Sequence, residues 1–174
     1  MIKGFLLTIA GLFIMVTVIS LFIPSKINTV KAEVIHAPQE KIYAEFSDLQ
    51  HWKNWQPVFK EDAGNIKISE PSSGIGAIAE WKKNEKINRV KITGTGKTFI
   101  RFLLTQEGEK DIENLVSISP VEDNTALQVQ WQSITHLHWY PWEKFAGIFI
   151  EKMAGPGYEA SLKALKKFVE NSPN

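Results

Sequence analysis

The segment from residue 36 to residue 57 constrains the fold of this chain more than any other part of the sequence. Before it, Val30, Ala32 and Val34 alternate with charged residues, which is the period of a half-buried strand. Pro38 then favours a helix start, because proline at the first helical position forfeits a donor that has no partner there. The apolar face of this helix and the two tryptophans after it comprise Ile42, Phe46, Leu49, Trp52 and Trp55. This order predicts short helices between a first strand, at 27–36, and the rest of a sheet.

Residues 65–134 have the pattern of an antiparallel sheet. Apolar runs recur between turn signals, the last of which lies at 123–124. In the run at 127–132, Leu127, Val129 and Trp131 share one face, and three glutamines share the other. Such alternation is typical of a strand with one buried and one solvated face. The expected strands begin near residues 66, 77, 87, 99, 115 and 127.

The C-terminal region, residues 141–171, has the apolar spacing of a helix. Its first apolar stripe comprises Trp142, Phe145, Phe149 and Met153, and its second comprises Tyr158, Leu162, Leu165 and Val169. Gly155, Pro156 and Gly157 interrupt the pattern. Proline removes an i−4 hydrogen bond and glycine weakens a helix, so we expect a kink or a break there.

The N-terminus carries an uncharged apolar run between Lys3 and Lys26. Twenty helical residues span about 30 Å, the hydrocarbon thickness of a bilayer. A helix also satisfies its own backbone hydrogen bonds, so it can lie in lipid. We therefore expect a transmembrane anchor over residues 1–26 and a separate domain over residues 27–174.

Two alternatives to a retained anchor are a cleaved signal peptide and a buried core helix. A small-residue cleavage site at 30–32 lies well beyond the run, which is also longer than the roughly 7–15 apolar residues of a signal peptide. The positive charges that flank the run are nearly balanced. We expect a single-pass membrane protein, and a cytoplasmic N-terminus with an extracytoplasmic domain is slightly favoured.

Composition excludes several kinds of function. The chain has no cysteine, which removes disulfides, thiolate metal sites and cysteine nucleophiles. Its formal net charge of +1 differs from the basic footprint of nucleic-acid-binding proteins, so no nucleic-acid partner is expected.

Two glycine motifs imitate nucleotide-binding loops. Gly96-Lys97-Thr98 resembles the end of a phosphate-binding loop, but residue 91 is lysine where that pattern needs glycine. Gly74 and Gly76 resemble a dinucleotide fingerprint, yet they lie between expected strands. We interpret both motifs as turns, and no cofactor is predicted.

His136 and His138 are the best candidates for metal ligands. Residues i and i+2 on a strand point to the same side, and Glu143 could supply a third ligand. Histidines that are exposed or hydrogen-bonded are the more ordinary interpretation. Glu80, beside Trp81, could likewise be a buried carboxylate or a solvated strand residue. The sequence predicts no metal site and no catalytic residue.

The sequence resembles the SRPBCC superfamily, which includes START-like lipid-transfer domains and polyketide cyclase/dehydrase-like proteins. The resemblance is strongest between Ala37 and Pro57, and Trp81, Val129-Gln-Trp131 and the final helix support it. It is greatest with bacterial members that carry one N-terminal transmembrane anchor. It implies an α+β helix-grip fold, in which a curved antiparallel sheet wraps a long C-terminal helix around a hydrophobic cavity.

We expect membrane-tethered binding of a lipid or other hydrophobic small molecule in an apolar cavity, without covalent catalysis. A bilayer anchor places such a cavity near a supply of lipid, and mostly apolar concavities are the usual ligand sites. The expected lining comprises Trp81, Ile100, Phe102, Leu127, Val129, Trp131, Phe149 and Met153.

Two other functions fit the same fold. One is a cyclase or hydrolase on a hydrophobic substrate, because positioning in a pocket can itself catalyse a reaction. A polar cavity residue with a perturbed pKa would favour this enzyme. The other is a partner-binding stress-response module, which an exposed apolar patch over a closed interior would favour.

Overall fold

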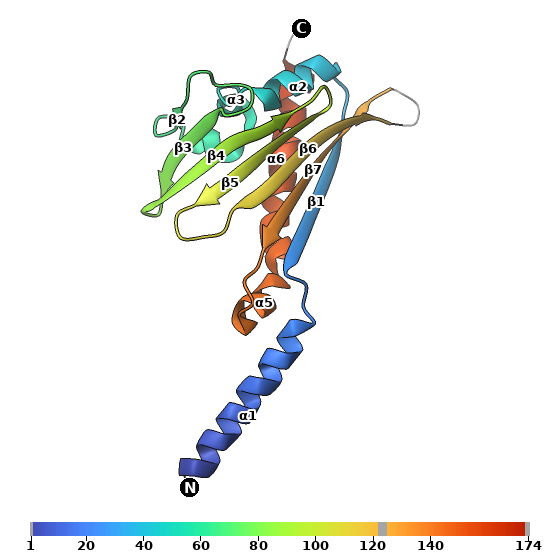
Figure 1. Ribbon diagram of the computed structural model, residues 1–174. Coiled ribbons are helices and arrows are strands. Elements are labelled where there is room, and N and C mark those ends of the chain that lie inside the picture. Colours follow the sequence, from blue (N-terminus) through green and yellow to red (C-terminus); the bar gives the residue numbers. More distant parts are fainter. Residues whose placement is uncertain (1, 122–124, 173–174) are drawn as a thin grey trace.

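The computed structural model describes residues 2–121 and 125–172 (Figure 1). The turn expected at 123–124 lies outside these residues. In chain order the elements are α1 (Ile2–Leu21), β1 (Lys26–Ile35), α2 (Gln39–Ser47), α3 (Trp52–Trp55), α4 (Pro57–Glu61), β2 (Lys67–Ile68), β3 (Ile78–Lys83), β4 (Lys86–Thr95), β5 (Phe99–Gln106), β6 (Ile112–Pro120), β7 (Leu127–His136), α5 (Pro141–Gly147) and α6 (Ile150–Asn171).

Within the described residues, the strands form one seven-stranded antiparallel sheet with the order β1-β7-β6-β5-β4-β3-β2. The first strand pairs with the last, and Lys31 lies opposite Trp131. The chain must therefore cross from one edge of the sheet to the other between β1 and β2, and α2, α3 and α4 occupy this crossover. The long helix α6 runs along one face of the curved sheet (Figure 1). The expected helix-grip fold is confirmed.

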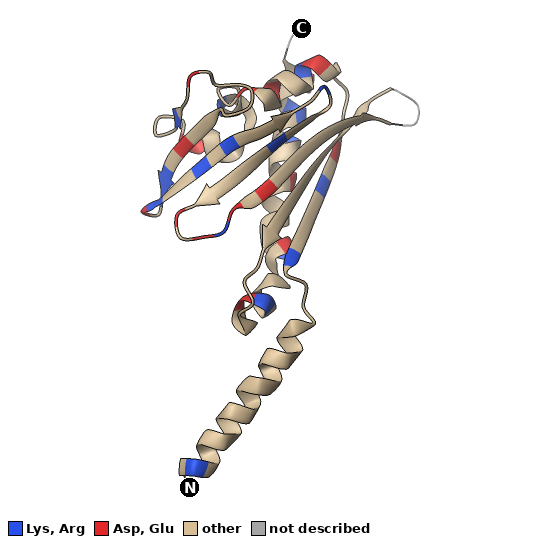
Figure 2. Ribbon diagram, viewed as in Figure 1, with Lys and Arg blue, Asp and Glu red and all other residues tan. Residues whose placement is uncertain are grey.

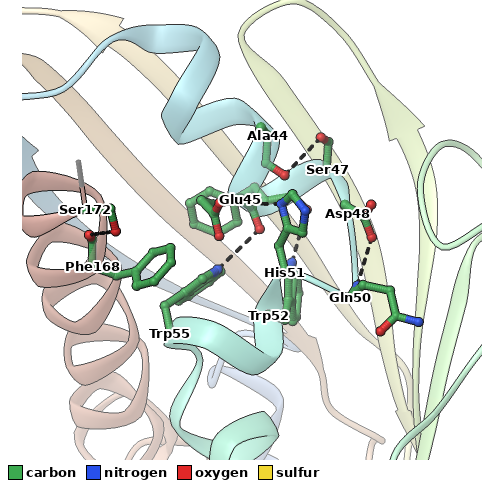
Figure 3. Close-up of polar contacts among 11 residues, drawn as sticks. Ala44, Glu45, Ser47, Asp48, Gln50, His51, Trp52, Trp55, Phe168 and Ser172 are labelled. Carbon is green, nitrogen blue, oxygen red and sulfur yellow. Dashed lines mark hydrogen bonds and ion pairs between the residues drawn. The ribbon is translucent and has the colours of Figure 1, made fainter. Parts of the chain in front are cut away.

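The crossover helices are fixed by a cluster of buried aromatic rings. Trp52 and Trp55 are almost fully buried, and the Trp52 ring lies 5.2 Å from that of Phe59 and 5.3 Å from that of Phe102. Each indole N–H also has a backbone acceptor. Trp52 donates to the Phe46 carbonyl at 3.1 Å. Trp55 donates to the Glu45 carbonyl at 3.3 Å (Figure 3). Both indoles bury their apolar surface while their N–H groups stay hydrogen-bonded, so they hold α2 and α3 against the sheet.

The C-terminal helical region differs from the expectation in the place of its break. It divides into α5 and α6 at Ile148 and Phe149, whereas α6 runs through Pro156. The division follows Gly147, where a Cβ atom would collide with the side chain of Leu137. Pro156 has no N–H to donate to the carbonyl of Lys152. Both residues are exposed, so water can donate to that carbonyl instead.

The N-terminal helix α1 extends away from the sheet and the other helices (Figure 1). An 18-residue stretch of this helix has a mean hydropathy of 2.4 and is almost wholly exposed. It carries no charged residue except near its N-terminal end (Figure 2). The helix is therefore long and apolar enough to span a bilayer, a property that a signal sequence shares.

We predict that Trp52→Ala lowers the free energy of unfolding by about 3–5 kcal/mol, because truncation leaves a cavity among packed rings. Urea unfolding of the full chain in detergent, followed by near-ultraviolet circular dichroism, measures the change. Ile75→Ala, at an exposed position, is the control, with an expected change within about 0.5 kcal/mol. Equal effects of the two substitutions would contradict the role of the aromatic cluster.

Candidate functional site

The candidate site is a cleft between the sheet and α6. Its first part, the inner cavity, has a volume of about 410 Å³. Its walls come from α3, α4, strands β3 to β7 and the middle of α6, and they are mostly apolar. The lining residues are Trp52, Gln56, Pro57, Val58, Phe59, Trp81, Val90, Phe102, Leu104, Ile112, Asn114, Trp131, Ala154, Gly157, Tyr158, Ala160 and Ser161.

A second part, the outer cavity, continues the cleft toward α5 and has a volume of about 560 Å³. The two cavities share Leu104, Ile112, Ala154 and Tyr158, so they adjoin each other along α6. The outer cavity is more polar. Its remaining lining comprises Thr29, Asn88, Gln106, Glu109, Lys110, Ser133, Thr135, His136, Leu137, Glu143, Ala146, Gly147, Ile150 and Met153.

Small side chains on α6 explain why the cleft is not filled. Ala154, Gly157 and Ser161 recur at i, i+3 and i+7, so they share one helix face with Tyr158. Opposite them, alternation along the strands turns large side chains such as Phe102 and Trp131 inward. The small side chains on this helix face do not fill the concavity of the strongly curved sheet, so space for a ligand remains between helix and sheet.

The structure places four of the eight residues expected to line a cavity in the cleft, three of them at the inner cavity and one at the outer cavity. Trp81, Phe102 and Trp131 line the inner cavity, and Met153 lies at the outer cavity with 79% of its surface exposed. Ile100 and Val129 are buried in the core, and Leu127 packs against that core. Phe149 is 58% exposed, and it belongs to neither lining in the described part of the chain.

Sequence reasoning missed the small residues of α6 as cavity lining, and it did not identify Tyr158 and Ser133 as polar residues of the cleft. The sequence did contain an indication of this face, because Ala154, Gly157 and Ser161 are small residues at helical spacing and lie on one side of the helix. Apolar periodicity gives weight to large side chains, and it pointed instead to Phe149 and Met153.

A polar pair lies where the two cavities join. The Tyr158 hydroxyl and the Ser133 Oγ are 2.8 Å apart. Burial raises the pKa of Tyr158, and the hydrogen bond with Ser133 offsets part of that rise. The phenol therefore stays neutral near pH 7 and can donate a hydrogen bond, but it is a poor general base.

A second polar group in the inner cavity is satisfied within the protein. The Trp131 indole donates to Asn114 Oδ1 at 3.0 Å, and the Asn114 amide donates to the Ile112 carbonyl at 3.0 Å. These bonds fix the Trp131 ring in the cavity wall. They also leave that wall effectively apolar toward a ligand.

The two histidines considered as metal ligands each pair with a different carboxylate. His136 Nε2 lies 3.2 Å from Glu113 Oε1, and His138 Nδ1 lies 2.8 Å from Glu143 Oε2. Partial burial would raise the pKa of Glu143, but hydrogen bonds from the His138 backbone and ring outweigh it and hold that pKa below its usual range. Across residues 2–121 and 125–172, no group of three or more His, Asp or Glu residues is arranged to hold a metal ion.

Glu45 and His51 form a further polar pair, at the helical corner away from the cleft. His51 Nδ1 lies 3.4 Å from Glu45 Oε1 (Figure 3). Burial raises the pKa of Glu45, although the charge of His51 opposes this rise. Glu80, in contrast, is a solvated strand residue that pairs with Arg89 at 2.6 Å. Neither carboxylate reaches the cavities.

The glycine motifs are turns, as expected. Gly74 and Gly76 have φ values of +81° and +97°, a conformation that glycine adopts without strain. Gly96 belongs to the connection between β4 and β5, where its N–H donates to the Phe99 carbonyl at 2.9 Å.

Comparisons with known proteins bear on the fold alone. No protein-family model matches the chain, and no curated protein sequence matches it. Solved structures with similar folds include a START superfamily protein from Mycobacterium smegmatis, which is 18% identical, covers 82% of this chain and 97% of its own, and has a TM-score of 0.59. The Aha1 dimer from Colwellia psychrerythraea is 17% identical, with 85% and 99% covered and a TM-score of 0.56.

A protein of unknown function from Staphylococcus aureus is 12% identical, with 83% of this chain and 94% of its own covered and a TM-score of 0.64. The chain therefore has a START-like helix-grip fold. This confirms the fold that the sequence resemblance implied.

We predict that Tyr158 makes the stability of the chain sensitive to alkaline pH. Its pKa is raised on folding, so the native state holds this proton more tightly than the unfolded chain does. Its contribution is complete below about pH 10, the pKa of an unfolded tyrosine, and is lost as pH rises through the folded pKa. Tyr158→Phe removes this dependence.

Unfolding of the wild type and of Tyr158→Phe in denaturant, repeated at increasing alkaline pH, measures the difference. The stability of the variant is expected to decline less steeply. Parallel curves for the two proteins would contradict the prediction.

Proposed function

We propose that this chain binds a lipid or other hydrophobic small molecule in the cleft between the sheet and α6, without covalent catalysis. The observation that carries the proposal is the inner cavity, an apolar space of about 410 Å³ beneath small side chains of α6. Ligand sites are typically concave, mostly apolar and about 300–1,000 Å³ in volume. A START-like fold supports ligand binding in general, since its curved sheet provides such a concavity.

The change in polarity along the cleft favours an amphipathic ligand. Aromatic and aliphatic side chains surround the inner cavity, whereas Glu109, Lys110 and His136 lie at the outer one. A hydrocarbon tail in the inner cavity would bury apolar surface at about 25 cal/mol per Å². A polar group in the outer cavity would keep its hydrogen bonds, with Tyr158 and Ser133 at the junction.

We further propose that residues 1–26 are a retained transmembrane anchor and that residues 27–174 form the ligand-binding domain. The length and hydropathy of α1 support a bilayer span. The positive charges on the two sides of the helix are nearly balanced, and an extracytoplasmic position for the domain remains slightly favoured. Such a tether would keep the cleft close to its supply of ligand.

The Tyr158–Ser133 pair also supports a second candidate, a cyclase or hydrolase that acts on a hydrophobic substrate. The raised pKa of Tyr158 argues against its use as a base, because an enzyme that needs a tyrosine base must lower that pKa. A neutral phenol is better suited to orient a polar group of the ligand. Binding is therefore the better-supported function.

Ala154→Phe tests the proposal, because Ala154 lines both cavities and a phenyl ring there would occupy their junction. The full chain is extracted from its host membrane in polymer-bounded lipid discs and examined by native mass spectrometry. We expect the wild type to retain a bound hydrophobic molecule and the variant to lose it several-fold.

The matched control is Ala63→Phe, which adds the same ring at an exposed position outside both cavities. It should retain the ligand at the wild-type level. A wild type without ligand, or equal retention by both variants, would rule out binding in this cleft.

A further inference from the structure

The segment formed by α5 and the first turn of α6 reverses the usual pattern of burial. The ammonium-bearing side chain of Lys144 is buried, with 5% of its surface exposed. Trp142, in contrast, is 65% exposed, and Trp139, Ile148, Phe149 and Met153 are also exposed. We call these five apolar side chains the foot. Large exposed apolar side chains gathered within residues 139–153 point to a surface that is covered in the functional state.

Three hydrogen bonds tie the segment that carries the foot to the connection that follows α1. The Lys144 ammonium donates to the Ile23 carbonyl at 2.7 Å and also to the Ser25 hydroxyl. The Leu137 amide donates to the Ser25 carbonyl at 2.8 Å. A buried lysine is stable only when it is paired in this way, so the contact fixes α5 beside the last turn of α1. Figure 1 shows α5 between α1 and the sheet.

The chemistry of the foot matches a bilayer surface. Tryptophan and tyrosine are enriched where lipid meets water, because an apolar ring with a polar edge satisfies both sides. Trp142 stacks on Tyr140, with ring centroids 5.0 Å apart and planes inclined by 5°. Phe22, the residue after α1, is also exposed, so the exposed apolar residues of α1 continue one position past the helix.

The foot also borders the outer cavity. Ala146 and Gly147 of α5 and Ile150 of α6 line that cavity, and Met153 belongs both to the lining and to the foot. A surface that covers the foot therefore lies next to one opening of the cleft.

We propose that the foot inserts into the headgroup region of the bilayer that α1 crosses and holds the outer cavity against the lipids of that leaflet. This inference rests on the proposed membrane tether and specifies how the tethered domain is oriented. The occupant is the lipid surface, because the foot is continuous with a helix long enough to span that bilayer and is held to its end by Lys144. A second copy of the chain or another protein would have to cover a surface that already adjoins the lipid.

Single-cysteine variants of the full chain test the proposal, and the natural absence of cysteine leaves no background labelling. Trp142→Cys and Phe149→Cys report on the foot. Leu12→Cys reports on α1, and Ile75→Cys reports on an exposed apolar position in the loop between β2 and β3, far from α5 (Figure 1). Each variant is labelled with an environment-sensitive fluorophore and reconstituted into vesicles of phosphatidylcholine and phosphatidylglycerol. Quenching is measured with iodide in water and with spin-labelled lipid.

We expect the probes at 142 and 149 to be quenched several-fold less by iodide than the probe at 75, and strongly by lipid labelled near its headgroup. The probe at 12 should respond to lipid labelled deep in its chain. Protection of 142 and 149 from iodide without quenching by lipid would indicate a protein cover and would overturn the proposal.

The experiment distinguishes a wrong prediction about membrane insertion of the foot from a wrong prediction about the proposed function. If the probe at 12 responds to lipid while those at 142 and 149 behave like the probe at 75, the tether stands and the foot is wrong. If the probe at 12 does not respond to lipid, α1 does not span the bilayer, and both the proposed tether and the insertion of the foot are contradicted. Ligand binding in the cleft is judged separately, by mass spectrometry of the Ala154→Phe and Ala63→Phe variants.

Discussion

The packing around Trp131 joins every layer of this domain. Its ring lies 5.9 Å from that of Phe46 on α2, 5.6 Å from that of Phe102 on β5 and 5.3 Å from that of Tyr158 on α6. Its N–H is fixed by Asn114 on β6. The same indole lines the inner cavity, so the side chain that unites helices and sheet also shapes the site. Because these rings are in packing contact, the cavity wall at Trp131 is part of the packed core.

Local patterns were enough to predict the sheet and the helical corner. The alternation that places Val129 and Trp131 on one face of β7 depends only on neighbouring residues, and so does the helical spacing of Ile42 and Phe46. The break between α5 and α6 was misplaced because it depends on a distant contact. Gly147 lies against Leu137, and the sequence pattern of the helical region does not predict this contact.

The site was less predictable than the fold, for a related reason. Inward-facing strand residues such as Phe102 follow from alternation, but the part of α6 that faces them depends on how that helix is placed against the sheet. The burial of Lys144 was also beyond sequence reasoning, since its partner at Ile23 is 121 positions away. Trp142 and Phe149 were therefore assigned to an apolar helix stripe, and Phe149 to the cavity lining, although the structure leaves both exposed.

The connection between α1 and β1 is only the four residues from 22 to 25. Even fully extended, four residues reach about 14 Å, so in the tethered arrangement that we propose the domain stays at the surface of its own membrane. A protein held so closely cannot ferry a lipid across an aqueous gap to another compartment. It is suited instead to stationary work, in which a molecule is lifted from the adjoining leaflet, kept out of it, or presented to whatever approaches from the water.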